Sequence, residues 1–184
     1  MLAAWKADKT NTKTAEEQLR AYIDLYNACI SKRPHDLHLG VHICRGNFKD
    51  SRHFSEGGYE RVAKTLFDGL NVDTFYMEYD TPRAGGFEPL KDLPRNKNVI
   101  LGVITSKFPK LEDMEQLKAK VYQAADIIAK GNGQTREQAL RRMGVSPQCG
   151  FASHSAGNAI SRDEMIEKLK LVRKLADEIW PGEP

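Results

Sequence analysis

The sequence contains no apolar run of about 18 residues, the length that a membrane-spanning helix requires. Residues 1–18 also lack the charged segment followed by an apolar segment that marks a secretory signal peptide. We find no internal repeat and no low-complexity stretch. These absences favour a cytoplasmic protein that has no membrane partner.

Charge of one sign is scarce, because 28 Lys and Arg residues are offset by 25 Asp and Glu residues, for a formal net charge of +3. Basic and acidic side chains are interleaved along the expected helices, so we expect no nucleic-acid partner. Cysteine is scarce too, since only Cys29, Cys44 and Cys149 occur. A small, odd number of cysteines argues against a disulfide scaffold, and in a reducing compartment such residues are buried, metal-bound or catalytic.

Hydrophobic periodicity divides the chain into alternating helices and strands. Thr14 and Glu17 form a capping-box pattern before an apolar stripe, which predicts a helix that Pro34 ends. The expected helices are 14–32, 57–70, 110–130, 135–142 and 161–180, and the expected strands are 37–44, 72–79, 98–104 and 144–149, with a long loop over 80–97. Strict alternation of strand and helix predicts a parallel α/β fold, here a single domain over residues 1–184.

Four side chains capable of binding a metal fall at the carboxyl ends of expected strands. His42 and Cys44 form an H-x-C pair, whose spacing of two places both side chains on one strand face. Glu78 lies near the end of the second strand, and Cys149 ends the last one. Active sites of parallel sheets are built at this edge. Because imidazole, thiolate and carboxylate are zinc ligands, the four residues predict a zinc site that activates a thiol at neutral pH.

The same residues allow simpler interpretations. Both cysteines of the set fit small buried side chains, and His42 fits a hydrogen-bonded core histidine. Glu78 could instead pair with Arg83 or Lys107. Cys29 lies near the apolar stripe of the first helix, and we expect it to have a packing role.

Other polar residues in the loops beside the candidate ligands are candidates for substrate contacts or for support of the ligands. The simpler alternative for each is loop architecture, because Asn and Asp satisfy turn backbone and Arg can bridge loops. These residues are Arg45, Asn47, Asp80, Arg83, Ser153 and Asn158.

Several segments around these positions carry a family resemblance. They are HICRGNF (42–48), GGYERVAKTLF (57–67), MEYDTPRAGGFEPL (77–90), LGVITSK (101–107) and SPQCGFAS (146–153). In this order they resemble the C-terminal catalytic domain of cobalamin-independent methionine synthase, and most closely its short members of the methionine synthase II type. The resemblance extends from about residue 20 to about residue 180.

This resemblance implies a (β/α)8 barrel in which His42, Cys44, Glu78 and Cys149 hold Zn2+. In the family, zinc binds the thiolate of homocysteine, which takes the methyl group of 5-methyltetrahydrofolate polyglutamate and becomes methionine without cobalamin. The resemblance therefore implies a zinc-dependent methyltransferase whose small-molecule substrates are homocysteine and methylfolate.

The chain departs from the family pattern in length. A (β/α)8 barrel usually needs roughly 250 residues, so this chain resembles the C-terminal half of a barrel, with about four βα units and a leading helix. In the family, the earlier half supplies acidic residues for the substrate ammonium and much of the folate pocket. A half barrel would expose strand edges and apolar faces, so we expect self-association or a partner that covers them.

Lys107 is the second departure, because it stands where well-characterised family members have a histidine proton donor. We assign Lys107 this catalytic role as an expectation, although the free pKa of lysine, about 10.4, suits a general acid poorly unless burial lowers it. Two alternatives stay open: a zinc-thiol methyltransferase with another donor or acceptor, and a truncated zinc-binding half-domain that is inactive alone.

Overall fold

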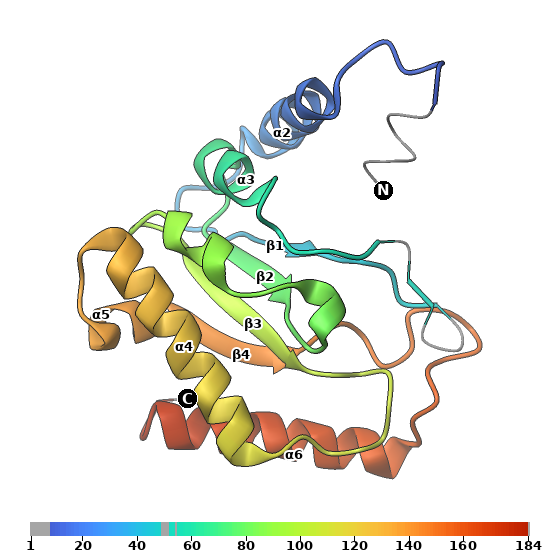
Figure 1. The fold of residues 1–184 in the computed structure, drawn as a ribbon, viewed down its shortest axis with the longest axis vertical. Helices are drawn as coiled ribbons and strands as arrows, with labels where there is room; N and C mark the ends of the chain where they lie inside the picture. The colour runs from blue at the N-terminus through green and yellow to red at the C-terminus, as the bar shows by residue number, and fades with distance from the viewer. Residues whose placement is uncertain (1–7, 49–51, 54, 184) are drawn as a thin grey trace.

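Helices and strands alternate along the chain in the computed structural model (Figure 1). The structure describes residues 8–48, 52–53 and 55–183. The helices are α2 (Ala15–Ile30), α3 (Ala63–Gly69), α4 (Met114–Asn132), α5 (Arg136–Leu140) and α6 (Arg162–Ile179), and the strands are β1 (Gly40–Ile43), β2 (Thr74–Glu78), β3 (Asn98–Ile104) and β4 (Met143–Pro147). None of the helices in these ranges is long and apolar enough to cross a membrane.

The four strands form one parallel sheet in the order β1-β2-β3-β4. Strands that are neighbours in the chain are therefore neighbours in the sheet, with helical segments in each connection. The arrowheads in Figure 1 all point toward the same edge, so the carboxyl ends of the strands lie together. The predicted parallel α/β fold is confirmed.

One face of the sheet, called here the covered face, carries the hydrophobic core. Its strand residues are all fully or almost fully buried: Phe75, Met77, Val99, Leu101 and Val103. Buried residues of α4 belong to the same core, including Leu117, Val121 and Ile128, and Figure 1 shows α4 crossing in front of the sheet. Apolar burial on this face stabilises the fold by about 25 cal/mol per Å² of surface removed from water.

The opposite face, called here the open face, combines polar side chains and glycines with two large residues, Tyr76 and Ile100. The alternate residues of the same strands point to it, because side-chain direction alternates along a strand. A groove of about 430 Å³ runs over it, lined by Gly40, His42, Tyr76, Ser146, Pro147, Gln148, Cys149 and Gly150. Tyr76 is 40% exposed in this groove, so the open face offers space next to the candidate ligands.

Several element boundaries differ from the predicted ones. The predicted helix over 57–70 begins only at Ala63. Gly57 has φ +102°, which a helix does not allow, and the following residues form a turn in which Val62 and Ala63 both donate to the Tyr59 carbonyl oxygen. The predicted loop over 80–97 contains two short 3-10 helices, Pro82–Ala84 and Glu88–Asp92.

The strands that carry the candidate ligands are shorter than predicted. β1 covers Gly40–Ile43 rather than 37–44, because the backbone N–H of Leu39 donates to the side chain of Asp73 instead of to a strand. Cys44 therefore follows β1. Since β4 ends at Pro147, Cys149 lies in the following loop rather than on the strand.

Candidate metal centre

Four potential metal ligands meet at the carboxyl edge of the sheet. His42 lies on β1, Cys44 follows that strand, Glu78 ends β2, and Cys149 lies two residues beyond β4. One ligand atom of each lies within 4.8 Å of the ligand atoms of the others. The structure thus brings together all four side chains that the sequence predicted as ligands.

Two distances within this cluster match the edges of a zinc tetrahedron. The Sγ atoms of Cys44 and Cys149 are 3.7 Å apart, and His42 Nε2 lies 3.4 Å from Glu78 Oε1. Bond lengths of about 2.3 Å to sulfur and about 2.0–2.1 Å to nitrogen or oxygen give tetrahedral edges of about 3.8 Å and about 3.4 Å. The donor set and these two distances therefore fit a zinc ion.

The sheet has to curve to build this cluster. β1 and β4 are separated by β2 and β3, and three spacings of about 4.8 Å would place their ends about 14 Å apart in a flat sheet. The sulfur atoms that follow these two strands are nevertheless 3.7 Å apart. The ends of β1 and β4, with the loops that follow them, therefore bend toward each other over the open face.

Gly102 on β3 has no side chain, and this leaves room for contacts between residues of β2 and of the loop that follows β4. It is the register partner of Glu78, and a Cβ atom placed on it would lie 2.9 Å from Gln148 Cα and 3.1 Å from the carbonyl oxygen of Met77. Across this gap Gln148 Nε2 donates to Glu78 Oε1 at 3.0 Å. Ser106 Oγ in turn donates to Gln148 Oε1 at 3.0 Å.

Contacts within the cluster change its proton affinities. Hydrogen bonds with Cys149 and Glu78 raise the pKa of His42 to about 10. The hydrogen bond from His42 lowers the pKa of Cys149, whereas burial raises the pKa of Cys44. Burial alone would raise the pKa of Glu78, but hydrogen bonds from His42 and Gln148 outweigh it and leave that pKa lowered. The acidic groups thus favour a positive charge among them, as a divalent cation would supply.

The sequence also matches a known protein family. The family model described as the catalytic domain of cobalamin-independent synthase matches residues 20–178. The chain belongs to this family. Two curated relatives, the uncharacterized proteins YxjG and YxjH of Bacillus subtilis (strain 168), are each 39% identical to it, over 168 and 155 residues. The matches cover 91% and 84% of this chain but 42% and 38% of the relatives, so the chain spans about two fifths of their length.

A solved structure supports the same assignment. The putative vitamin-B12 independent methionine synthase from Listeria monocytogenes is 31% identical to this chain, with a TM-score of 0.67. The match covers 94% of this chain and 44% of that one. The predicted fold class is confirmed: the chain has four parallel strands with helical connections that correspond to half of a TIM-barrel-like fold.

The guanidinium group of Arg45 is fully hydrogen-bonded within the protein. All five of its guanidinium N–H donors have protein acceptors: Tyr59 Oη, the Glu78 and Ala84 carbonyl oxygens, and the Gly57 carbonyl oxygen, which accepts two of them. Its backbone N–H donates to Glu78 Oε2 at 3.2 Å, and the residue is 4% exposed. These contacts favour support of Glu78, and the predicted contact of Arg45 with substrate stays a prediction.

Asp80 and Arg83 form a loose, buried pair beside Glu78. Arg83 Nη2 lies 3.8 Å from Asp80 Oδ1 and 3.9 Å from Glu78 Oε2. The side chain of Asp80 has no solvent exposure, and neither of its oxygens has a hydrogen-bond partner among the described residues. The expected alternative, pairing of Glu78 with Arg83, therefore exists only as a long contact and coexists with the metal cluster.

Lys107, Ser153 and Asn158 lie in the loops around the two cysteines. Lys107 is 2% exposed, and burial lowers the pKa of its ammonium group. Ser153 Oγ lies 4.0 Å from Cys149 Sγ. Asn158 Nδ2 donates to the carbonyl oxygens of Ser106 and Gly150. The roles predicted for these three residues in catalysis or substrate binding stay predictions.

Sequence reasoning missed Gly102 and Gln148 as parts of the centre. A glycine inside a strand signals a close approach by another group, and that signal was available at Gly102. Gln148 adjoins Cys149 in sequence, but its hydrogen bond to Glu78 depends on the curved sheet. The expected packing role of Cys29 is not seen, because it is exposed on α2.

Proposed function

We propose that this synthase domain binds one zinc ion through His42, Cys44, Glu78 and Cys149 and uses it to activate a thiol for methyl transfer. The observation that supports this best is the pair of distances, 3.7 Å between the sulfurs and 3.4 Å between imidazole and carboxylate, which match a zinc tetrahedron. A thiol bound to zinc loses its proton near neutral pH and becomes a nucleophile.

Glu78 is the ligand best prepared to make way for a substrate thiol. Gln148 Nε2 and the backbone N–H of Arg45 already donate to its two carboxylate oxygens, and Arg83 lies 3.9 Å away. These donors would keep the carboxylate charge satisfied after the thiol takes its place. His42, Cys44 and Cys149 would remain as the fixed ligands.

The substrates that we propose are homocysteine and 5-methyltetrahydrofolate, with methionine as the product. The family description and the name of the Listeria monocytogenes protein support this choice. In this reaction the sulfur lone pair forms the bond to the methyl carbon, the bond from that carbon to folate N5 breaks, and N5 takes up a proton. Ser153 is the substrate contact with most support, because it is exposed beside Cys149. The carboxylate of Asp80 has no hydrogen-bond partner among the described residues, but it is buried beside Arg83, so a substrate would reach it only after that side chain moves.

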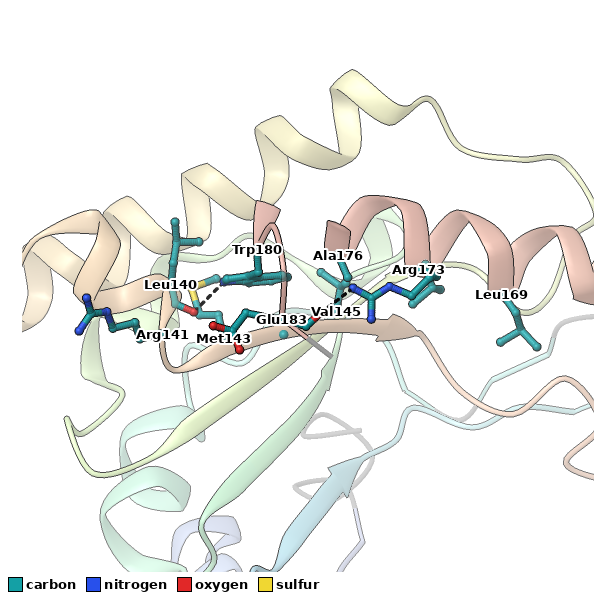
Figure 2. Close-up of a pocket in the computed structure, with 11 residues that line it drawn as sticks. Leu140, Arg141, Met143, Val145, Leu169, Arg173, Ala176, Trp180 and Glu183 are labelled. Atoms are coloured by element: carbon teal, nitrogen blue, oxygen red, sulfur yellow. Dashed lines mark hydrogen bonds between the residues drawn. The ribbon is translucent and has the colours of Figure 1, made fainter. Parts of the chain in front are cut away.

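The open edges of the half barrel support the proposal that a second copy of the chain covers them. A groove of about 550 Å³ lies between β4 and α6, and Figure 2 shows the ring of Trp180 and the side chain of Leu169 along it. At the other end of the sheet, α2 exposes Tyr22, Leu25 and Tyr26. Each copy thus has one apolar groove and one apolar stripe, which two copies related by a twofold axis could exchange.

Size-exclusion chromatography with light scattering at several concentrations tests this association. We expect a dimer that Leu25→Glu dissociates, whereas Lys130→Glu on the exposed surface of α4 leaves it intact. A compact monomer at all concentrations would contradict self-association. If the chain stays monomeric alone but forms a complex with a separate chain that corresponds to the other part of its relatives, that chain and not a second copy would be the partner.

We also propose a cytoplasmic location. All three cysteines are free thiols in the structure, and free thiols together with a zinc-thiolate site suit a reducing compartment.

Zinc content per chain tests the central proposal. Protein purified without chelator should carry about one zinc ion, Cys149→Ala should lose it, and Cys29→Ala should keep it because Cys29 is exposed on α2. A methyl-transfer assay with homocysteine and methyltetrahydrofolate then follows. Zinc binding without transfer would favour the alternative, a zinc-binding half-domain that is inactive alone or that uses another donor or acceptor, and the open sheet edges are the observation that favours this alternative.

A further inference from the structure

Lys107 is a buried cation with defined partners close to both cysteines. It follows β3, is 2% exposed, and its Nζ donates to the carbonyl oxygen of Gly46 and to Asn47 Oδ1, both at 3.1 Å. Burying a charged group is unfavourable unless hydrogen bonds compensate for the lost water. These two bonds therefore fix where the ammonium group lies.

Asn47 extends these contacts to the second cysteine loop. Its Nδ2 donates to the Gly150 carbonyl oxygen at 2.7 Å and to Ser153 Oγ at 2.6 Å. Because an ammonium group can only donate and a carbonyl oxygen can only accept, Lys107 and Gly150 together determine the orientation of the Asn47 amide. Without Lys107 the amide would lose the partner that keeps its N–H groups directed at Gly150.

The network ends next to each sulfur atom. Gly46 is two residues after Cys44 and its backbone N–H donates to Cys44 Sγ at 3.3 Å. Gly150 directly follows Cys149. Lys107 thus connects, from a third loop, two segments that lie more than 100 residues apart in the chain.

We propose that Lys107 is a positioning residue that sets the separation of the Cys44 and Cys149 sulfurs through Gly46 and Asn47. This inference rests on the proposed zinc site. It also includes a charge effect, because two thiolates and a carboxylate around a divalent ion leave a net charge of −1. The buried ammonium of Lys107 is repelled by Arg83 but attracted to Glu78 and Cys149, so it offsets part of that charge.

Lys168 supplies a matched control. It is also fully buried, and its Nζ donates to the carbonyl oxygen of Lys110 and to the carboxylate of Glu112. None of these hydrogen bonds reaches a cysteine loop, although Glu112 also accepts from the backbone N–H of Thr105, two residues before Lys107. Lys107→Met and Lys168→Met therefore both remove a buried, hydrogen-bonded ammonium, but only the first removes one from the cysteine network.

Three measurements distinguish positioning from a general effect on stability. Zinc affinity is measured by chelator competition, the Co2+-substituted protein gives the thiolate-to-cobalt and d–d absorption bands, and thermal unfolding gives stability. We expect Lys107→Met to lower zinc affinity about 10- to 100-fold, the range for residues that orient metal ligands, and to shift the cobalt bands. Lys168→Met should lower the unfolding temperature and leave both metal readouts unchanged.

A second variant tests the route through Asn47. Asn47→Asp can still accept from Lys107 but has no N–H to donate to Gly150, so we expect a similar loss of zinc affinity. The double variant should lose less than the sum of the two single losses, because the two residues act in one chain of contacts. Wild-type affinity and cobalt bands in Lys107→Met would overturn the proposal, whatever its stability.

A metal-free measurement separates this inference from the proposed function. In a Cys29→Ser background, a bifunctional thiol reagent should crosslink Cys44 and Cys149 several-fold more slowly in Lys107→Met than in the parent or in Lys168→Met. If the parent protein binds no zinc, the proposed function fails, and this rate still decides the role of Lys107. An unchanged rate would overturn the inference.

Discussion

The covered and open faces of the sheet are built from the same strands but differ in the size and polarity of their side chains. Leu101 and Gly102 are adjacent on β3. Leu101 is fully buried in the core under the helices, whereas Gly102 lies beside the four candidate metal ligands and has no side chain. The covered face is filled with large apolar groups, whereas the open face is kept small next to polar ligands. Stability and chemistry are thus separated by a change of one residue along the strand.

This separation should appear when residues from the two faces are substituted in turn. Substitutions on the covered face should change unfolding and leave metal binding intact in the folded protein. Substitutions on the open face should do the reverse. Gly102 is the expected exception, because a Cβ atom there would meet backbone atoms of two neighbouring segments. Any other residue that changes both properties to the same extent would weaken the distinction.

The largest effect on metal binding is expected for His42→Ala on the open face. It removes a proposed ligand, so zinc affinity should fall by more than the roughly 100-fold limit for residues outside the ligand set. The His42 side chain is 39% exposed, so the metal-free protein should lose only the stability that its hydrogen bonds with Glu78 and Cys149 supply, which is less than a core truncation removes. Zinc titration and thermal unfolding of the metal-free form measure both. A large loss of metal-free stability would show that His42 belongs to the folding core.

The largest effect on stability is expected for Leu101→Ala on the covered face. Truncation leaves a cavity among fully buried neighbours and should lower the free energy of unfolding by about 2–5 kcal/mol. Urea unfolding measures this loss. Zinc stoichiometry of the folded fraction should stay that of the parent, and a coupled loss of zinc would contradict independence of the two faces.

Gly102→Ala should produce a moderate effect on both properties. The added Cβ would lie 2.9 Å from Gln148 Cα, so the chain must shift, at a cost of about 1–3 kcal/mol. The shift also moves Gln148 away from Glu78, and zinc affinity should fall about tenfold or more. Gly86→Ala is the control, because a Cβ there meets no atom within 4 Å.

The smallest effect is expected at Asp73, where the chain leads into β2. Hydrogen bonds from Arg33 lower its pKa to about 2, from a usual value of 3.8. A lowered carboxyl pKa stabilises the fold fully above the unfolded-state pKa, and this contribution is lost as the pH falls from about 4 through about 2. Asp73→Asn should therefore cost about 1 kcal/mol at pH 7, and the difference from the parent should vanish near pH 2. Urea unfolding against pH tests this, with exposed Asp68→Asn as the control.

The sequence predicted the fold well because its signals are local. Thr14 and Glu17 form the expected capping box, and the alternating pattern of β2 places Phe75 and Met77 in the core. It also selected the four side chains that meet in the cluster, from residue type and position near strand ends.

What the sequence could not predict depends on long-range geometry. The guanidinium group of Arg45 donates hydrogen bonds to the carbonyl oxygens of Gly57, Ala84 and Glu78, which belong to segments that meet only in the folded chain. The burial of Lys107 depends on Gly46 and Asn47, some 60 residues away. Neither arrangement has a local sequence pattern, so both residues resemble ordinary loop cations until the structure is known.

The agreement between strand order and chain order has a consequence for folding. Each strand can join the sheet as soon as its own βα unit has formed, so most of the sheet can grow through contacts that are short in sequence. The two sulfurs, however, are 105 residues apart, and they approach each other only after β4 has docked and the sheet has curved. A metal ion that needs both would bind only the completed fold, and its capture would mark the last step of assembly.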